Sequence, residues 1–262
     1  MRPPPYSFTF EPLFLVAVAL AAVAYARAAR REAVAAGRIV LFTLGLVLLA
    51  APLNSPLETL AANYLVLMHL TQNALTADWA PLFLLLGLTP AMRAGLAARL
   101  GRPFARITRP PVALVFWLLV WYGTHLGVTY DFALRHSWAL NLQHALLIVA
   151  GLCFWWPVIA REQVGLSTPG TLAYLGAAFA GSLFLGLALI FSSTAFYDFY
   201  VAAPRLWGLS AVKDQNLGGI VMNGEQTIVF LAALSYFLLR LLNEEEEEQR
   251  EREASSGEAL SL

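Results

Sequence analysis

The chain has little charge and almost no cysteine. Only 13% of its 262 residues are Asp, Glu, Lys or Arg, whereas soluble domains contain about a quarter. The 17 basic and 17 acidic residues balance, so no excess of positive charge indicates nucleic-acid binding. The single cysteine, Cys153, excludes an internal disulfide framework and a multi-thiolate metal site within one chain. The sequence also has no nucleotide-binding glycine loop and no Ser/His/Asp arrangement, so an enzyme is the least expected class.

The chain is rich in hydrophobic residues, which make up 59% of it. They form seven runs near the ~20 residues that a helix needs to cross ~30 Å of hydrocarbon. This pattern predicts an all-α polytopic membrane protein with seven transmembrane helices. A strongly basic loop is expected between the third and fourth spans. The expected spans cover residues 13–29, 39–53, 63–90, 111–127, 138–159, 171–192 and 217–239.

The basic residues predict the orientation in the cell membrane. Thirteen of the 17 fall on one side of the seven spans and four on the other, so the positive-inside rule places the amino terminus outside and the carboxyl terminus in the cytoplasm. Residues 1–11 are then extracytoplasmic, and residues 12–243 form the transmembrane domain. The acidic residues 244–262 are expected to continue the last helix for a turn or two and then to be disordered.

Polar residues inside the third span are the first functional candidates, because polar groups at membrane depth are costly. His69, Gln72 and Asn73 are spaced i, i+3 and i+4, which places them on one helix face. At 1.5 Å per residue, His69 lies about 12 Å from the outer end of its span, and His144 of the fifth span lies about 9 Å deep. Asn141 lies one turn above His144 on the same face.

The seventh span adds Met222, Glu225 and Gln226 at about 8 to 14 Å from its outer end. The two other histidines, His125 and His136, follow at the outer end of the fourth span and in the loop after it. All four histidines are therefore expected in the outer half of the protein. Imidazole binds copper, zinc and iron, and the Met thioether favours Cu(I), so this half is a candidate metal site.

Three other interpretations of these residues stay open. Buried His, Asn and Gln side chains also form hydrogen bonds that hold membrane helices together. His69 and His144 could instead be the two axial ligands of a haem. A transporter or proton channel would use Asp78 and Glu225 as relays.

Three segments resemble the family of CtaG-type cytochrome c oxidase assembly factors. HLTQNALTADWAPLFLLLG looks like the family motif, which reads approximately HMxQH, then AP and LLxLG. NLQHALLIVAGLCFWWPV is similar to the family's second histidine segment, and DQNLGGIVM resembles its Asp–Gln–x–x–Gly–Gly–x–x–Met signature. The matching positions are His69, Gln72, His144, Asp214, Gln215, Gly218, Gly219 and Met222.

The resemblance implies a non-enzymatic membrane protein that helps to build haem–copper oxidase, through copper delivery to oxidase subunits. A homodimer stays open. Where the family motif has its second histidine, this chain has Asn73, a poor copper ligand, so the site has fewer imidazoles or uses His125 or His136. The expected metal ligands are His69, His144 and Met222, with His125 and His136 as further candidates. The expected surrounding residues are Gln72, Asn73, Asn141, Asp214, Gln215, Glu225 and Gln226.

Overall fold

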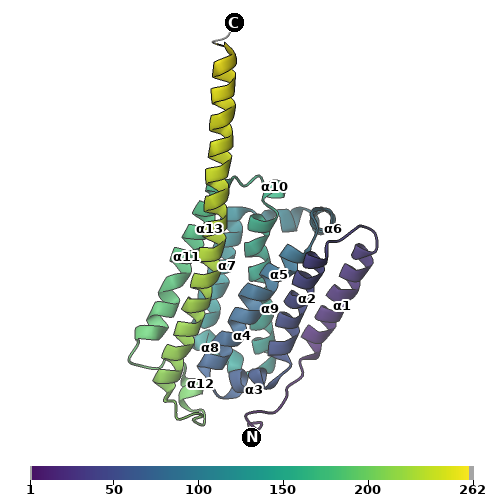
Figure 1. Cartoon of the computed structure of the whole chain (residues 1–262). Coiled ribbons are helices and arrows are strands. Elements are labelled where there is room, and N and C mark those ends of the chain that lie inside the picture. The colour runs from purple at the N-terminus through teal and green to yellow at the C-terminus, as the bar shows by residue number, and fades with distance from the viewer. Residues whose placement is uncertain (1, 260–262) are drawn as a thin grey trace.

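The computed structural model describes residues 2–259, and every regular element in that range is a helix (Figure 1). The predicted all-α class is confirmed. Five helices are long and apolar enough to cross a membrane. They are α1 (Pro12–Ala29), α2 (Ala36–Leu53), α9 (Ser137–Ile159), α11 (Thr168–Phe191) and the Ala211–Ser255 part of α13 (Ala211–Ala259).

The third and fourth expected spans each end at a sharp bend into a further helix. The first bent pair begins with a rod made of α4 (Val66–Asn73), the π-helix η1 (Ala74–Trp79) and α5 (Ala80–Gly87). The helix α6 (Pro90–Ile107) follows this rod at an angle of 110°. In the second pair, α7 (Pro110–His125) meets α8 (Gly127–Arg135) at 69°. By length and composition, the described helices therefore provide five candidate spans, or up to seven if each bent pair counts as one.

Short helices mark the two ends of the bundle. The helices α3 (Pro56–Asn63) and α12 (Asp198–Val201) lie at one end, here named the histidine end (Figure 1). The other end carries α6 and α10 (Arg161–Val164) and is named the arginine end. The chain enters α1 from the histidine end, and α13 leaves the bundle at the arginine end.

The expected basic loop is instead the helix α6. Its residues include many Ala, Leu and Arg, which are strong helix formers. The Thr89 hydroxyl accepts a hydrogen bond from the backbone N–H of Met92, and Pro90 occupies the first helical turn. The helix breaks at Gly101, where φ is 63°. None of its residues is fully buried: Arg99, Arg102 and Arg106 are exposed on the helix surface, and Arg93 is half-buried.

The end of α13 also differs from the expectation. The helix continues to Ala259, well beyond the turn or two that the acidic run predicts. Ion pairs at i, i+4 spacing support this extension: Arg240 lies 2.7 Å from Glu244, and Arg250 lies 3.7 Å from Glu246. Glu, Gln and Arg also have high intrinsic helix propensity, which explains why a charged run continues the helix.

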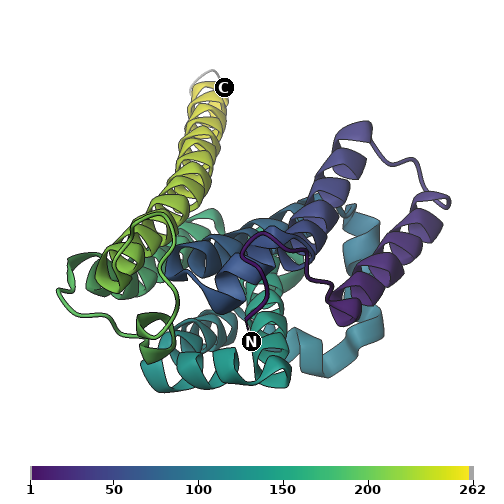
Figure 2. The ribbon, with the colours of Figure 1, turned by 90° about the horizontal axis from the view of Figure 1, so that it is seen from below.

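The bundle is built around α9 and the α4–η1–α5 rod. Seen along its axis, α13 lies on one side of this rod and the α1–α2 pair on the other (Figure 2). In α9, 67% of the most apolar 18-residue stretch is buried, whereas in α1 the buried share is 11%. The helix α9 is therefore central and α1 is peripheral. A cluster of buried aromatic side chains fills the centre, among them Trp117, Trp121, Phe154, Trp155 and Phe230.

Candidate functional site

His69 of α4 and His144 of α9 lie side by side in the interior. Their ring centroids are 5.7 Å apart and the rings meet edge to face, at 66°. Each side chain is only 1% exposed. Phe14 of α1 packs edge-on against His144, with ring centroids 6.2 Å apart. Three helices thus enclose the pair, and the contact predicted between the third and fifth spans is present.

A hydrogen bond to Tyr200 determines which nitrogen of His69 is free. The Tyr200 hydroxyl donates to the carbonyl oxygen of Ala61, at 2.5 Å. Its oxygen must therefore accept from Nδ1 of His69, at 2.8 Å, because a hydroxyl has only one proton to donate. Nε2 of His69 is then the nitrogen with a lone pair, and it has no hydrogen-bond partner. This is the tautomer that a metal-binding imidazole requires.

His125 has the same arrangement. Its Nδ1 lies 2.7 Å from the carbonyl oxygen of Trp121, which can only accept, so Nδ1 carries the proton and Nε2 the lone pair. Nε2 is buried without a partner. Tyr130 lies between this imidazole and His69, with ring centroids 5.7 Å and 4.8 Å away respectively. His125 therefore joins the cluster through Tyr130.

Two expected members of the site lie elsewhere. His136 is exposed at the end of α8, stacks on Phe132 at 4.3 Å, and its Nδ1 lies 2.9 Å from the Phe132 carbonyl oxygen. The amide of Asn141 donates to the Glu11 carboxylate at 3.0 Å. Asn141 thus fastens the segment before α1 to α9 and is bonded away from the histidines.

The expected amides also have different neighbours. Gln72 donates through Nε2 to the Pro52 carbonyl oxygen at 2.9 Å and to the Glu58 carboxyl group at 2.5 Å. Glu58 lies in α3, outside the spans, and burial raises its pKa to about 7. Asn73 is buried and neither its amide nitrogen nor its amide oxygen has a partner. Gln226 is also buried, and its side chain lies next to the Asp78 carboxyl group.

Asp214 positions the helix that carries His69. Its two carboxylate oxygens accept from the backbone N–H groups of Val66 and Leu67, at 2.9 and 3.0 Å. These are the first residues of α4, whose own N-cap residue, Leu65, provides no side-chain cap. The carboxylate satisfies donors that a helix start leaves unpaired and complements the positive end of the helix dipole. Asp214 therefore caps α4 from α13.

The residues after Asp214 hold α13 against its neighbours. Gln215 accepts from the Phe196 N–H at 2.7 Å and donates to the Thr194 carbonyl at 3.2 Å. A Cβ on Gly218 would lie 2.9 Å from Leu70 of α4, and one on Gly219 would lie 2.9 Å from Leu189 of α11. A larger residue at Gly219 would meet the fixed Cβ of Leu189, whereas one at Gly218 would have to displace a terminal methyl group of Leu70.

Met222 follows one turn later on α13 and is 1% exposed. It belongs to the apolar cluster that also contains Leu70, Tyr130 and Tyr200. Both Tyr130 and Tyr200 contact His69, so Met222 shares a cluster with its direct neighbours.

Glu225 faces the π-helix. Its carboxyl group is buried beside the indole of Trp79, and Asp78 of η1 lies close enough to act on it electrostatically. The π-helix packs closely on α9, because a Cβ on Gly151 would come within 2.0 Å of the Ala77 carbonyl oxygen. Single π-turns often occur at functional sites. The carboxyl groups of Asp78 and Glu225 form a second polar cluster. It lies closer to the arginine end than the histidines do, because η1 follows α4 in that direction.

The donor set of the histidine cluster suits a soft ion. Two imidazoles that share one ion at about 2 Å from each nitrogen hold their centroids roughly 5–6.5 Å apart, and the 5.7 Å between His69 and His144 lies in this range. Both nitrogens of His144 are buried without a partner. Within residues 2–259, no three or more His, Cys, Asp or Glu side chains are grouped to hold a metal ion. Two imidazoles at this separation could share one ion.

Sequence reasoning did not include several residues of this cluster. Tyr130, Tyr200, Glu58 and Gln143 are buried around the expected site, and Nε2 of Gln143 has no partner. Tyr200 lies in a polar segment between two spans, where a tyrosine gives no periodic signal. Its position near the outer end of the seventh span was the one available indication.

A family model described as cytochrome c oxidase caa3 assembly factor (Caa3_CtaG) matches residues 19–244. The match covers every helix that provides a histidine of the cluster. No match is found among curated proteins or among solved structures.

Proposed function

The chain belongs to the cytochrome c oxidase caa3 assembly factor family, and from this premise we propose that it binds Cu(I) and delivers it to the oxidase. His69 and His144 are the proposed ligands, and Met222 and His125 are the nearest candidates for a third. Imidazole and thioether are ligands that Cu(I) accepts, and a Cu(I) ion tolerates a low coordination number. Asn73 takes no part as a ligand in this proposal.

The observation that carries the proposal is the open nitrogen on each of two adjacent buried imidazoles. Nε2 of His69 and both nitrogens of His144 lack partners, and the two rings are 5.7 Å apart. An unpaired buried polar atom costs roughly 1–3 kcal/mol, so a ligand that satisfies these atoms would be bound favourably. Tyr200 orients the first ring through Nδ1, as hydrogen-bonded partners do at metal sites.

The proposed orientation places the histidine end outside the cell membrane. Basic residues of membrane proteins concentrate on the cytoplasmic side, and thirteen of the seventeen belong to the arginine end. In this arrangement each bent helix pair contributes one crossing, with α6 at the cytoplasmic surface, so the chain crosses the membrane seven times and the tail of α13 is cytoplasmic. Copper would be taken and passed on from the outer half.

The two alternatives are weaker. A haem with His69 and His144 as axial ligands needs space for the macrocycle between the rings, but these rings contact each other edge to face and Tyr130 packs on His69. A transport function has one observation in its favour, the buried carboxyl groups of Asp78 and Glu225 at the π-helix. An Asp78→Asn variant with lower flux and unchanged copper content would support it.

The test uses His69→Ala and His144→Ala as single variants, with His136→Ala as the matched control because that imidazole is exposed. Copper content of the purified protein and caa3-type oxidase activity of the membranes are measured together. Both should fall in the first two variants and remain at the wild-type level in the control. Unchanged values for both His69→Ala and His144→Ala would contradict the proposal.

A further inference from the structure

A cavity of about 850 Å³ lies at the arginine end, far from the histidine cluster. It is bordered by residues of α2, α5, α9, α10 and α13, including Leu41, Leu82, Val158 and Ile228. α13 packs against α4 and η1, whereas α2 and α9 pack against α5. The cavity opens where these two groups of helices separate toward the arginine end, and its volume is in the range of single-ligand sites.

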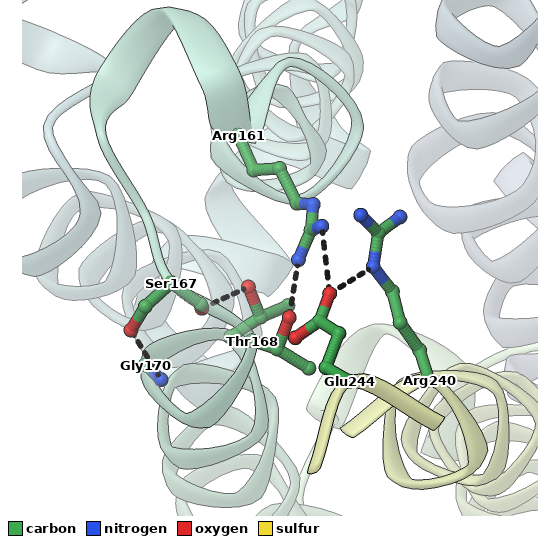
Figure 3. Close-up of polar contacts among 7 residues, drawn as sticks. Arg161, Ser167, Thr168, Gly170, Arg240 and Glu244 are labelled. Atoms are coloured by element: carbon green, nitrogen blue, oxygen red, sulfur yellow. Dashed lines mark hydrogen bonds and ion pairs between the residues drawn. The ribbon is translucent and has the colours of Figure 1, made fainter. Parts of the chain in front are cut away.

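Four guanidinium groups border the cavity: those of Arg38, Arg93, Arg161 and Arg240. They come from four different helices, so the fold gathers them from distant parts of the sequence. Glu162 also lines the cavity. Glu244 is shared by two of the arginines, at 2.7 Å from Arg240 and 3.6 Å from Arg161 (Figure 3). The four arginines therefore outnumber the two carboxylates beside them, Glu162 at the cavity and Glu244 on Arg161 and Arg240.

Arg38 and Arg93 hold most of the positive charge that no ion pair neutralises, although Glu162 acts electrostatically on Arg93. Arg38 donates to the carbonyl oxygens of Leu86 and Leu88, at 3.0 and 2.6 Å. Arg93 donates to the Leu88 carbonyl at 2.8 Å, while its Nε is buried without a partner. Among residues 2–259, neither guanidinium has a carboxylate within ion-pair distance. Guanidinium groups bind phosphate strongly and through two parallel hydrogen bonds.

The rest of the cavity is apolar and extends along α13. Ile228 and Arg240 both line it, and at 1.5 Å per residue they are about 18 Å apart. That length is close to one leaflet of a ~30 Å hydrocarbon core. Trp79 of η1 and Trp155 of α9 line the deep part, and Ile228 is 63% exposed on the side of α13. An acyl chain fits such a surface, whereas a free anion would use only the arginines.

We propose that this cavity binds an anionic phospholipid of the adjacent leaflet. The phosphate lies against Arg38 and Arg93, with Arg161 and Arg240 completing the border, and an acyl chain lies along the face of α13 between Arg240 and Ile228. Basic pockets between membrane helices are a recognised form of lipid headgroup site. The lipid connects α13 to the α2–α5 part of the bundle. The second polar cluster, Asp78 and Glu225, lies next to this connection.

The test is native mass spectrometry of the full chain in detergent, with phosphatidylglycerol, phosphatidylcholine or inorganic phosphate added. Wild type should retain phosphatidylglycerol. The Arg38→Gln/Arg93→Gln variant should retain at most about a tenth as much phosphatidylglycerol, since each arginine near a membrane surface contributes substantially to the binding of anionic lipid. Arg27→Gln/Arg99→Gln is the matched control, because both residues are exposed at the same end and outside the cavity; it should bind as wild type does.

A second variant tests the apolar part with all arginines present. Ala232 is exposed and lines the cavity, so Ala232→Trp fills the space without disturbing the core and should also displace phosphatidylglycerol. Equal retention of phosphatidylcholine, full competition by inorganic phosphate, or equal loss in the Arg27→Gln/Arg99→Gln control would each overturn the proposal. So would an Ala232→Trp variant that keeps its lipid but no longer co-purifies with the oxidase, because the occupant would then be a partner helix.

Discussion

The hydroxyl oxygen of Tyr200 lies 2.8 Å from Nδ1 of His69 and joins α12 to α4. Because the same hydroxyl donates to the Ala61 carbonyl, this contact leaves the lone pair of His69 on Nε2, toward the interior. A residue of a four-residue helix between two spans thus determines the tautomer of the proposed copper ligand.

Replacement of Tyr200 with Phe should lower the affinity for Cu(I) about ten- to hundredfold, the usual cost of removing a partner that orients a ligand. The variant loses the acceptor for the His69 Nδ1–H, so the ring can rotate or change tautomer. Competition titration of purified protein with a Cu(I) chelator measures the change. The matched control is Tyr174→Phe, which removes another buried tyrosine-to-carbonyl hydrogen bond, at 2.9 Å, away from the histidines. Equal losses in the two variants would indicate a general packing effect instead.

Asp214→Ala should destabilise the protein by about 1–3 kcal/mol, because two backbone donors at the start of α4 lose their acceptors. Thermal unfolding in detergent checks this, with the exposed Asp198→Ala as control. Asp214→Asn keeps one amide oxygen and should fall between wild type and Asp214→Ala. If Asp214→Ala unfolds at the wild-type temperature but loses copper, then Asp214 acts at the metal and the capping role is wrong.

Glu58→Gln should reduce the pH dependence of stability. Burial raises the pKa of Glu58 from 4.5 to about 7 in the folded protein, so the folded state binds more protons than the unfolded state between these two values. The contribution of Glu58 to stability is then complete below about pH 4.5 and is lost as the pH rises to 7, a change of about 3 kcal/mol.

The measurement is the difference in melting temperature between wild type and Glu58→Gln at pH 5 and at pH 8. Gln at this position can still accept from Gln72, and it carries no charge at either pH. The variant should therefore gain stability relative to wild type at the higher pH. A difference that does not change with pH would mean that Glu58 titrates normally.

The sequence predicted the pairing of His69 with His144 because depth along two helices can be counted from the span ends. The Asp214 segment could be identified from the sequence as a motif, but its capping role could not. The partners of Asp214 are Val66 and Leu67, some 150 residues earlier in the chain. The function of that segment depends on the approach of α13 to α4, and no local pattern encodes that approach. Likewise, Asn141 was expected at the site because it shares a helix face with His144, and His136 because it lies in the outer half. Neither signal indicates the exposed position of His136 or the bond from Asn141 to Glu11.

Two other differences concern α6 and the π-helix. The arginines of α6 were expected in a loop because charge follows a span there, yet Thr89 and Pro90 begin a helix. The π-helix η1 was not expected, because Ala74–Trp79 reads as ordinary apolar helix in sequence. Its position next to Gly151 depends on the close approach of α9.

The most direct test of the copper site is the amount of Cu(I) bound per chain after anaerobic loading and removal of loosely held metal. Wild type and His136→Ala should each retain about one Cu(I) ion, and X-ray absorption at the copper edge should show nitrogen ligands of the imidazole type. The His69→Ala/His144→Ala double variant, folded as judged by its unfolding transition, should retain almost none. Equal copper in the double variant and in wild type would contradict the proposed site.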